Sequence, residues 1–341
     1  MTSLELAQRL HQTTPLLVSH MDLPAELQLR RQAGETKVLR TRYADRLRRA
    51  GIRVIIGSMF VHPSYLPEMA LSSSLAQITA LLEDIEESGD LFCLVHNAKQ
   101  LDHALDLGQI AILLSLEGAE PLNADPALLR IFYTLGVRFL GLTWNGRTAY
   151  ADGCGIPGGG LTPKGRALVE AAWSLGMVLD VSHLNDACFD ELLHLGAGPV
   201  IASHSNCRAL CSHPRNLTDT QVIRLASRGG IIGVNQIRFL VCQPSAEASL
   251  DALCSHIQRI DRLTGPGHAG LGLDLARDYM ESLPKPRAYW QAWDPLEEDL
   301  LEDYQDLIRL TAALLDRGFS QEAAAGILGE NFLAFLRRTL L

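Results

Sequence analysis

Short apolar runs alternate with longer helix-like stretches along this chain, and no other feature of the sequence limits the possible folds as strongly. Such alternation predicts repeated strand–helix–strand units built on a parallel sheet. Several runs are nearly continuously apolar, as expected for strands that are covered on both faces. The best strand candidates are residues 16–19, 53–59, 111–116, 138–143, 177–181, 200–203, 231–235 and 270–273. Because a closed (β/α)8 TIM barrel requires eight strands, we predict an α/β protein with that fold.

The segments between these runs support the same fold. The clearest amphipathic helix patterns are residues 75–88, 165–175, 186–195 and 218–228. Glycines such as Gly176 suit the turns that lead back into the barrel. The run 91–95 is a ninth strand candidate, which we place at the periphery, and residues 295–341 are expected to form two C-terminal helices that cap the barrel. No Pro/Ser-rich linker divides the chain, so we expect a single domain over residues 1–341.

Length and charge narrow the class of protein. A chain of 341 residues could divide into two domains, but α/β barrels of more than about 250 residues commonly form one unit. Hydrophobic residues make up 47% and charged residues 20% of the chain, which is ordinary for a globular protein with a large core. The net charge of −9 argues against nucleic acid as a main partner, because phosphate binding requires a basic surface.

Cysteine use and hydropathy bear on the cellular compartment. The seven cysteines are an odd number and form no Cys-x-x-Cys pair, which argues against a disulfide framework and against a thiolate zinc site. The first fifteen residues lack the apolar core of a signal peptide. No apolar stretch approaches the roughly 18 residues of a membrane-spanning helix. We therefore expect reduced thiols, a cytoplasmic location and no membrane partner, while the sequence leaves open whether the chain forms a homodimer.

Residues that can bind metal stand where predicted strands end. They are His20 and Asp22 after the first strand, Glu117 after the third, His183 after the fifth, His204 after the sixth and Asp274 after the eighth. In a barrel the carboxyl ends of the strands meet at one mouth, where active sites lie. Side chains two residues apart on an extended chain point the same way, so His20 and Asp22 can share one ion. Three histidines and three carboxylates gathered at one mouth suit two zinc ions bound by nitrogen and oxygen.

Each of these residues also has an ordinary structural explanation. A single His-x-Asp pair is common, Glu117 before Gly118 could stand at the start of a helix, and His183 could be a hydrogen-bonded core histidine. Asp274 could cap a helix. The metal hypothesis rests on coincidence, because five predicted strands each end in a suitable ligand.

Nine short motifs occur in one order over most of the chain. They are His20-Met-Asp-Leu-Pro24, Ser115-Leu-Glu-Gly118, Gly141-Leu-Thr-Trp-Asn145, Gly160-Leu-Thr-Pro-Lys-Gly165, Leu179-Asp-Val-Ser-His183, Ser203-His-Ser-Asn206, His213-Pro-Arg-Asn216, Gly270-Leu-Gly-Leu-Asp274 and Gly326-Ile-Leu-Gly-Glu-Asn-Phe332. Through these motifs the chain resembles the membrane dipeptidase (renal dipeptidase) family. The Asp-Val-Ser-His motif and the Ser-His-Ser and His-Pro-Arg-Asn pair are the most specific of them.

The resemblance implies a (β/α)8 metallohydrolase of the amidohydrolase type with two zinc ions. The implied ligands are His20 and Asp22 for one ion, His183 and His204 for the other, and Glu117 as the bridge between them. Asp274 matches the family's catalytic aspartate, which would act as general base and then as general acid. Arg215 matches an arginine that binds the substrate's carboxylate, which a planar guanidinium can pair bidentately. The structural alternative for Arg215 is a surface arginine after a proline turn.

Two positions depart from the family pattern. Where this chain has Trp144, the family often has a histidine that is thought to contact the substrate or the developing oxyanion. Because Thr143 ends a predicted strand, we expect Trp144 to lie at the mouth as an apolar wall of the substrate pocket. The alternative is that it packs behind the strand. After Asp274 the chain reads Leu275-Ala276-Arg277 in place of the usual Phe-Asp-Gly, so a different pocket is expected there.

The function implied by the resemblance is that of a zinc-dependent dipeptidase acting on small peptide-like substrates. Two alternatives stay open. The first is a hydrolase of another small amide, such as a β-lactam, an N-acyl amino acid or a cyclic amide, which would use the same ligands. The second is a metal-binding homologue with impaired catalysis, for which Trp144 is the main argument.

Overall fold

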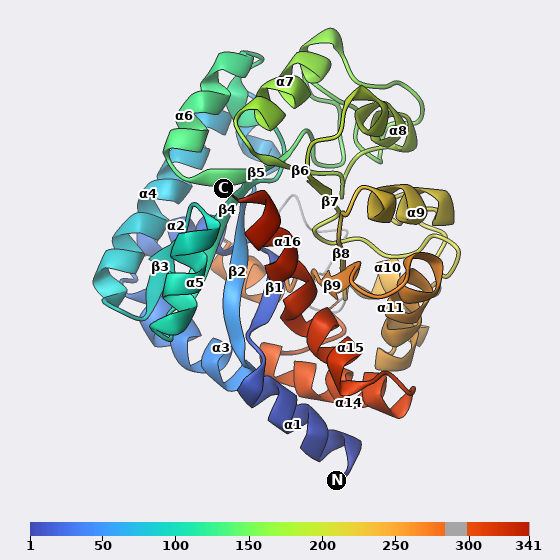
Figure 1. Ribbon diagram of the computed structural model, residues 1–341. Coiled ribbons are helices and arrows are strands. Elements are labelled where there is room, and N and C mark those ends of the chain that lie inside the picture. Colours follow the sequence, from blue (N-terminus) through green and yellow to red (C-terminus); the bar gives the residue numbers. More distant parts are fainter. Residues whose placement is uncertain (284–298, 341) are drawn as a thin grey trace.

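Eight parallel strands curve into a barrel, and helices surround it on the outside (Figure 1). The structure, a computed structural model, describes residues 1–283 and 299–340. The barrel strands are β1 (Leu16–Met21), β2 (Ile52–Met59), β4 (Ile110–Leu116), β5 (Val137–Gly141), β6 (Val178–Asp180), β7 (Val200–Ile201), β8 (Ile232–Val234) and β9 (Ala269–Leu271). Each overlaps a run that the sequence predicted, so the prediction of a (β/α)8 barrel is confirmed.

The strands pair in an order that closes the ring. Neighbours are parallel and follow the order β7-β6-β5-β4-β2-β1-β9-β8. The ring closes between β7 and β8, where Ala202 forms a parallel bridge with Ile232 and donates its backbone N–H to Ile231 O at 3.0 Å. The additional strand β3 (Phe92–Leu94) pairs with β4 and lies off the ring. It is the peripheral strand predicted at residues 91–95.

The four predicted amphipathic segments are helices α4, α7, α8 and α9. The described helices are α1 (Ser3–Thr13), α2 (Leu23–Gln32), α3 (Ala44–Ala50), α4 (Ala70–Ser88), α5 (Ala98–Asp106), α6 (Leu129–Thr134), α7 (Pro163–Ser174), α8 (Asp186–Leu195), α9 (Asp219–Ser227), α10 (Arg238–Val241), α11 (Leu250–Thr264), α12 (Arg277–Ser282), α14 (Leu307–Asp316), α15 (Gln321–Ala325) and α16 (Asn331–Thr339). Their starts follow from local sequence. The side chains of Thr162, Asn185 and Thr218 accept backbone N–H groups at the starts of α7, α8 and α9, which stabilises a helix terminus.

The C-terminal helices occupy two places. α15 and α16 are joined through a π-helical turn, Gly326–Glu330, into one helix that crosses the barrel in front of β1 and β9 (Figure 1). Asn331 Nδ2 donates to Ala269 O at 2.8 Å, so this helix covers the amino-terminal end of the strands. α14 instead packs on α1 and α11 in the outer layer. The predicted capping therefore holds for α15 and α16, while residues 295–298 and 341 of the predicted segment lie outside the described residues.

Apolar side chains fill the half of the barrel that this helix closes. The inner cluster contains Leu17, Val54, Ile56, Ala111, Leu113, Phe139, Val178, Ile201 and Ile231 from the barrel, with Phe332, Leu333, Phe335, Leu336 and Leu340 from the C-terminal segment. Above this apolar layer the inner wall carries buried hydroxyl groups, among them Ser19, Ser58 and Ser115. The barrel interior thus changes from apolar to polar toward the carboxyl ends of the strands.

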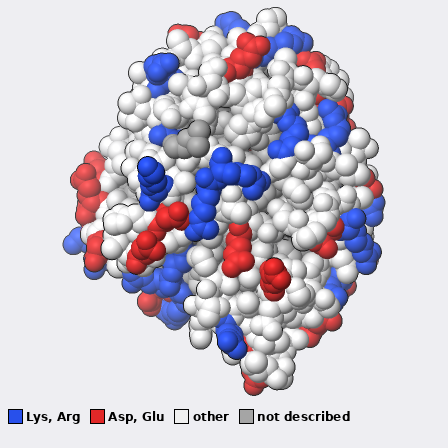
Figure 2. Space-filling model, in the orientation of Figure 1, with Lys and Arg blue, Asp and Glu red and all other residues white. Residues whose placement is uncertain are grey.

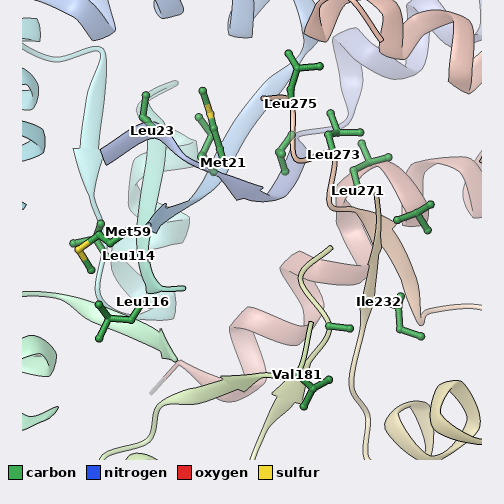
Figure 3. Packing of buried hydrophobic residues seen from close by; sticks show 14 of the residues in the cluster. Met21, Leu23, Met59, Leu114, Leu116, Val181, Ile232, Leu271, Leu273 and Leu275 are labelled. Carbon is green, nitrogen blue, oxygen red and sulfur yellow. The ribbon is translucent and has the colours of Figure 1, made fainter. Parts of the chain in front are cut away.

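The other face of each strand packs under the outer helices. Figure 3 shows Met59 beside Leu114 and Leu116 in this outer cluster. Leu113, which lies between two outward residues on β4, belongs to the inner cluster instead. Since side chains alternate along a strand, the inward face of β4 leads to Glu117.

Two glycines allow β8 and β9 to approach the end of β7. A Cβ on Gly272 would overlap the carbonyl oxygen of Ser203 and lie 2.9 Å from the backbone of Gly233. We therefore expect Gly272→Ala to lower the free energy of unfolding by about 1–3 kcal/mol, the usual cost of overpacking, as measured by urea denaturation. Gly146→Ala is the control, because a Cβ there meets no atom within 4 Å. Equal stability of the two variants would contradict this reading of the β7–β9 contact.

Charges of both signs are interspersed over the face that carries α16, without a broad field of one sign (Figure 2). Some form ion pairs between elements, as between Arg31 of α2 and Glu87 of α4 at 2.9 Å. Within the described parts of the chain, no helix combines the length and the apolar character needed to cross a bilayer.

Candidate metal centre and active site

The metal-capable residues singled out from the sequence converge at the carboxyl ends of the barrel strands. His20 lies in β1, Asp22 is the N-cap of α2, Glu117 follows β4, His183 follows β6, His204 follows β7 and Asp274 follows β9. Two triads have ligand atoms that all lie within 4.8 Å of one another: His20 with Glu117 and His204, and His20 with Asp22 and Asp274. His20 is common to both, so the triads form one cluster.

Glu117 lies between two groups of ligands. Its Oε1 is 2.8 Å from His183 Nε2 and 3.5 Å from His204 Nε2. Its Oε2 is 3.6 Å from His20 Nε2, and that nitrogen is also 3.7 Å from Asp22 Oδ1. One carboxylate oxygen therefore faces each group.

A bulge in β1 turns His20 into the barrel. Val18 and Met21 are three positions apart in β1, but their partners in β2, Ile55 and Gly57, are only two positions apart. Regular alternation from the inward Leu17 would send Met21 inward and His20 outward. The extra residue reverses this, as bulges beside active sites commonly do, and Met21 joins the outer cluster.

Each histidine of the cluster is held through its Nδ1. His20 Nδ1 lies 3.1 Å from Ser58 Oγ, His183 Nδ1 lies 2.9 Å from Asn145 Oδ1, and His204 Nδ1 lies 2.6 Å from Ser203 Oγ. A hydrogen bond at Nδ1 fixes the ring and leaves Nε2 for a metal, which is the usual arrangement of metal-binding histidines. The Nε2 atoms of His183 and His204 accordingly face each other at 2.9 Å.

Asp180, the last residue of β6, ties the two histidine loops together. Its Oδ1 accepts the backbone N–H groups of Ser182 and Ser203, each at 3.0 Å. The hydroxyl of Ser182 donates to the same oxygen at 2.7 Å, and the hydroxyl of Ser203 donates to Oδ2. Because these serines precede His183 and His204, one buried carboxylate fixes both ligand loops.

Burial and crowded charge perturb the ionisation of the cluster. Burial would lower the pKa of His20, but the surrounding carboxylates outweigh it and raise the pKa to about 10. Burial holds the pKa of His183 and His204 well below the usual range. It also raises the pKa of Glu117 well above its usual range. Such opposed shifts within one cavity are typical of functional sites.

The donors fit a divalent cation. His20 Nε2 and Asp22 Oδ1 are buried without a hydrogen-bond partner among the described residues, although buried polar atoms are normally satisfied. Both atoms face the cluster, where a cation would satisfy them. Imidazole nitrogen with carboxylate oxygen is the ligand set of zinc and related ions.

Asp274 adopts a backbone conformation that is rare for a residue other than glycine. Its φ is +56°, in the left-handed region, where aspartate and asparagine are tolerated better than most residues. Its Oδ2 accepts Asn235 Nδ2 at 3.0 Å, and its Oδ1 lies 3.7 Å from His20 Nε2. Asn235 therefore holds one oxygen while the other faces the cluster, and burial raises the pKa of this carboxyl.

Arg215 is buried at the edge of the cluster, with 6% of its surface exposed. Its Nη2 donates to His204 O at 3.0 Å, and its Nη1 donates to Ser205 Oγ at 3.2 Å and to Ser182 O. The surface-arginine alternative is therefore wrong. These contacts do not use every N–H of the guanidinium, and Arg215 also lines the cavity described next.

A cavity of about 690 Å³ opens over the cluster. Its polar lining includes Asp22, Glu117, His183, Arg215 and Asp274. Its apolar lining includes Phe60, Trp144, Ile237, Phe239, Tyr279 and Met280. The volume is in the range of small-molecule sites.

Trp144 lines this cavity rather than packing behind its strand. Its ring centroid is 5.9 Å from that of His183 and 5.2 Å from that of Phe60. Trp144 therefore lies at the mouth of the barrel, as expected from the sequence.

The other departure from the family pattern, at residues 275–277, forms an ordered turn. Ala276 lines the cavity, and the backbone N–H groups of Ala276 and Arg277 donate to Asp299 at 3.4 and 3.1 Å. Asp299 also accepts Gln236 Nε2 at 2.6 Å, and burial raises the pKa of its carboxyl to about 7. The turn after Asp274 is therefore tied to the end of β8.

Sequence reasoning missed the residues that hold the ligands in place. Asn145, Asp180 and Ser203 stand inside the quoted motifs, and Asn235 ends the predicted strand 231–235, so their proximity to the ligands was a usable signal. Ser58 likewise lies inside the predicted strand 53–59. Phe60 and Tyr279 carry no signal in the sequence, because their place in the cavity depends on loop conformations.

Known proteins resemble this chain in sequence. The family model for membrane dipeptidase (peptidase family M19) matches residues 4–340. The dipeptidase tcpJ of Claviceps purpurea is 30% identical over 271 residues, which cover 79% of this chain and 60% of that protein. The dipeptidase aclJ of Aspergillus oryzae is 34% identical over 233 residues, which cover 67% of this chain and 51% of that protein. The matches thus span between half and two thirds of these curated relatives.

Solved structures resemble this chain in fold. The dipeptidase AC, a metallopeptidase of family M19, has a TM-score of 0.83 at 26% identity, covering 96% of this chain and 99% of that chain. A metallopeptidase of Rhodobacter sphaeroides, solved with a phosphinate mimic of the dipeptide L-Ala-D-Ala, has a TM-score of 0.81 at 24% identity with the same coverage. The second likeness supports the fold alone.

Proposed function

Since the chain belongs to the membrane dipeptidase family, peptidase family M19, we propose that it is a metal-dependent dipeptidase that hydrolyses the amide bond of small dipeptides. The observation that carries this proposal is one cluster of three imidazoles and three carboxylates, with a cavity over it that a buried arginine also lines. The cluster suits a divalent cation, and the arginine suits a substrate carboxylate.

The proposed metal is a pair of zinc ions. His20 and Asp22 would hold one ion, His183 and His204 the other, with Glu117 between them. The support is that each Glu117 oxygen faces a different group of ligands. When bound, zinc would lower the pKa of a water and polarise the scissile carbonyl.

The remaining site residues have separate proposed roles. Asp274 would take the proton of the attacking water and pass it to the leaving amine nitrogen, as general base and then acid. Arg215 would bind the C-terminal carboxylate of the substrate, which favours dipeptides over longer peptides. Trp144 would form an apolar wall, because an indole donates one hydrogen bond but does not titrate as imidazole does.

A substrate panel tests the function directly. The zinc-loaded protein is expected to hydrolyse small dipeptides, to hydrolyse tripeptides poorly, and to lose activity when the metal is chelated. A β-lactam and an N-acyl amino acid belong in the same panel, because enzymes for those amides would use the same ligands. Rapid hydrolysis of one of these compounds with inert dipeptides would contradict the proposal.

Metal content tests the five proposed ligands. Elemental analysis of unchelated protein is expected to give two metal ions per chain, and anomalous scattering should locate both beside Glu117. His183→Ala is expected to lose one ion, because one of the two groups loses a nitrogen ligand. The control is His194→Ala, since His194 is exposed on α8. A wild-type chain that stays empty after zinc soaking would exclude the proposed centre.

A further inference from the structure

Three aromatic side chains, Phe60, Trp144 and Tyr279, form a continuous wall of the cavity, here termed the aromatic arch. The ring centroids of Phe60 and Trp144 are 5.2 Å apart with planes at 63°, and those of Phe60 and Tyr279 are 6.1 Å apart with planes at 89°. Edge-to-face contacts of this kind stabilise aromatic pairs. All three residues line the cavity, so the arch presents apolar surface to whatever binds there.

The arch is held in place by its apolar neighbours. Phe60 and Tyr279 belong to a buried apolar cluster with Ala25, Ala276 and Met280. Phe60 O also accepts Gln77 Nε2 from α4 at 2.6 Å. A wall that is already packed loses little side-chain entropy on binding, which favours selective recognition.

The strand order sets the arch against Arg215. Phe60 follows β2, and β2 stands four strands from β7 in either direction around the closed ring. Arg215 lies in the segment after β7 and donates to carbonyl groups of the β6 and β7 loops. Trp144 after β5 and Tyr279 after β9 flank Phe60. The metal-capable cluster therefore lies between the arch and Arg215.

Because the cluster lies between the arch and Arg215, the two residues of a bound dipeptide would lie on opposite sides of the cluster. With its carboxylate at Arg215, a dipeptide has its scissile carbonyl about one residue away, over the cluster, since consecutive Cα atoms are about 3.8 Å apart. The residue on the amino side then lies beyond the cluster, on the side of the arch. Asp22 and Asp274 follow β1 and β9 on that side, and their negative charge suits the α-ammonium group.

We propose that the aromatic arch binds the side chain of the N-terminal residue, so that the enzyme prefers dipeptides with a large apolar residue before the scissile bond. This inference rests on the proposed dipeptidase function and adds the substrate class to it. A second apolar group, with Ile237 and Phe239, lines the cavity after β8. Phe239 lies 5.5 Å, centroid to centroid, from His213 near Arg215. That group would contact the C-terminal residue instead.

The test compares two ratios of kcat/KM on the zinc-loaded protein. Phe-Gly against Ala-Gly reports on the N-terminal position, and Gly-Phe against Gly-Ala reports on the C-terminal position. Wild type is expected to prefer Phe-Gly over Ala-Gly by at least about tenfold, as apolar pockets discriminate by such factors. Phe60→Ala is expected to lower that ratio by about tenfold and to leave the Gly-Phe to Gly-Ala ratio unchanged.

Two further variants distinguish a loss of side-chain recognition from a general loss of folding. Phe60→Met keeps apolar volume and should retain most of the Phe-Gly preference, whereas Phe239→Ala should change only the C-terminal ratio. A general loss of folding would lower all four rates together and leave both ratios unchanged, which would count against the inference. Dipeptide hydrolysis without a Phe-Gly preference, or with one that Phe60→Ala leaves intact, overturns it while the proposed function stands. If no dipeptide is hydrolysed, the proposed function fails and this inference fails with it.

Discussion

Asp274→Asn is expected to lower kcat on dipeptides by at least about 10²-fold, the low end of what general acid–base catalysis contributes. Asparagine has nearly the same shape as aspartate and tolerates the left-handed backbone at this position, where φ is +56°. It can also accept the hydrogen bond from Asn235 Nδ2. The substitution therefore removes the proton acceptor and little else, so metal content should change little. Steady-state kinetics and elemental analysis on the same preparation measure both quantities.

The matched control for this variant is Asp45→Asn. Asp45 lies exposed on α3, so the same chemical change there should leave kcat as in wild type. Near-normal turnover of Asp274→Asn would remove this residue from the mechanism. A large loss of metal would instead assign it to the ligands, as its 3.7 Å distance from His20 Nε2 allows.

Arg215→Ala is expected to lower kcat/KM for dipeptides by about 10- to 100-fold and to affect their C-terminal amides much less. The reason is that hydrogen bonds to a charged partner contribute about 1.5–3 kcal/mol, and an amide offers no carboxylate to the guanidinium. The paired comparison is necessary because Arg215 also donates to His204 O and Ser182 O, beside two proposed ligands.

Metal analysis separates the two contributions of Arg215. If the contacts to the loops dominate, the variant loses metal, and kcat/KM falls equally for the dipeptides and their amides. That result would point to a structural role. Arg215→Lys keeps the charge but not the planar fork, so it should recover only part of the dipeptide activity and leave the amides close to wild type.

The barrel could be predicted from the sequence because parallel strands covered on both faces must be apolar along most of their length. All eight runs became barrel strands, and the run 91–95 became β3 at the edge. The C-terminal segment was harder, since an amphipathic pattern gives a helix but not the surface it covers. α14 accordingly belongs to the outer layer, whereas α15 and α16 close the barrel.

The site could be predicted in part. Alternation along β4 correctly leads to Glu117, because this strand pairs regularly with β2. Alternation along β1 fails at His20, whose inward direction depends on a bulge that apolar periodicity does not reveal. Phe60 and Tyr279 reach the cavity from loops and a short helix, so no period in the sequence marks them. The cytoplasmic location stays an untested prediction, and whether the chain forms a homodimer stays open.

The helix that crosses the amino-terminal end of the barrel affects when the barrel can fold during synthesis. The apolar cluster around Leu17 and Val54 also contains Phe332, Phe335 and Leu336. Water is therefore excluded from the barrel interior only after the early strands and this late helix have come together. During translation the inner apolar face of the early strands would stay exposed until residues 331–339 have been synthesised. Until then the incomplete barrel exposes apolar surface, which promotes aggregation.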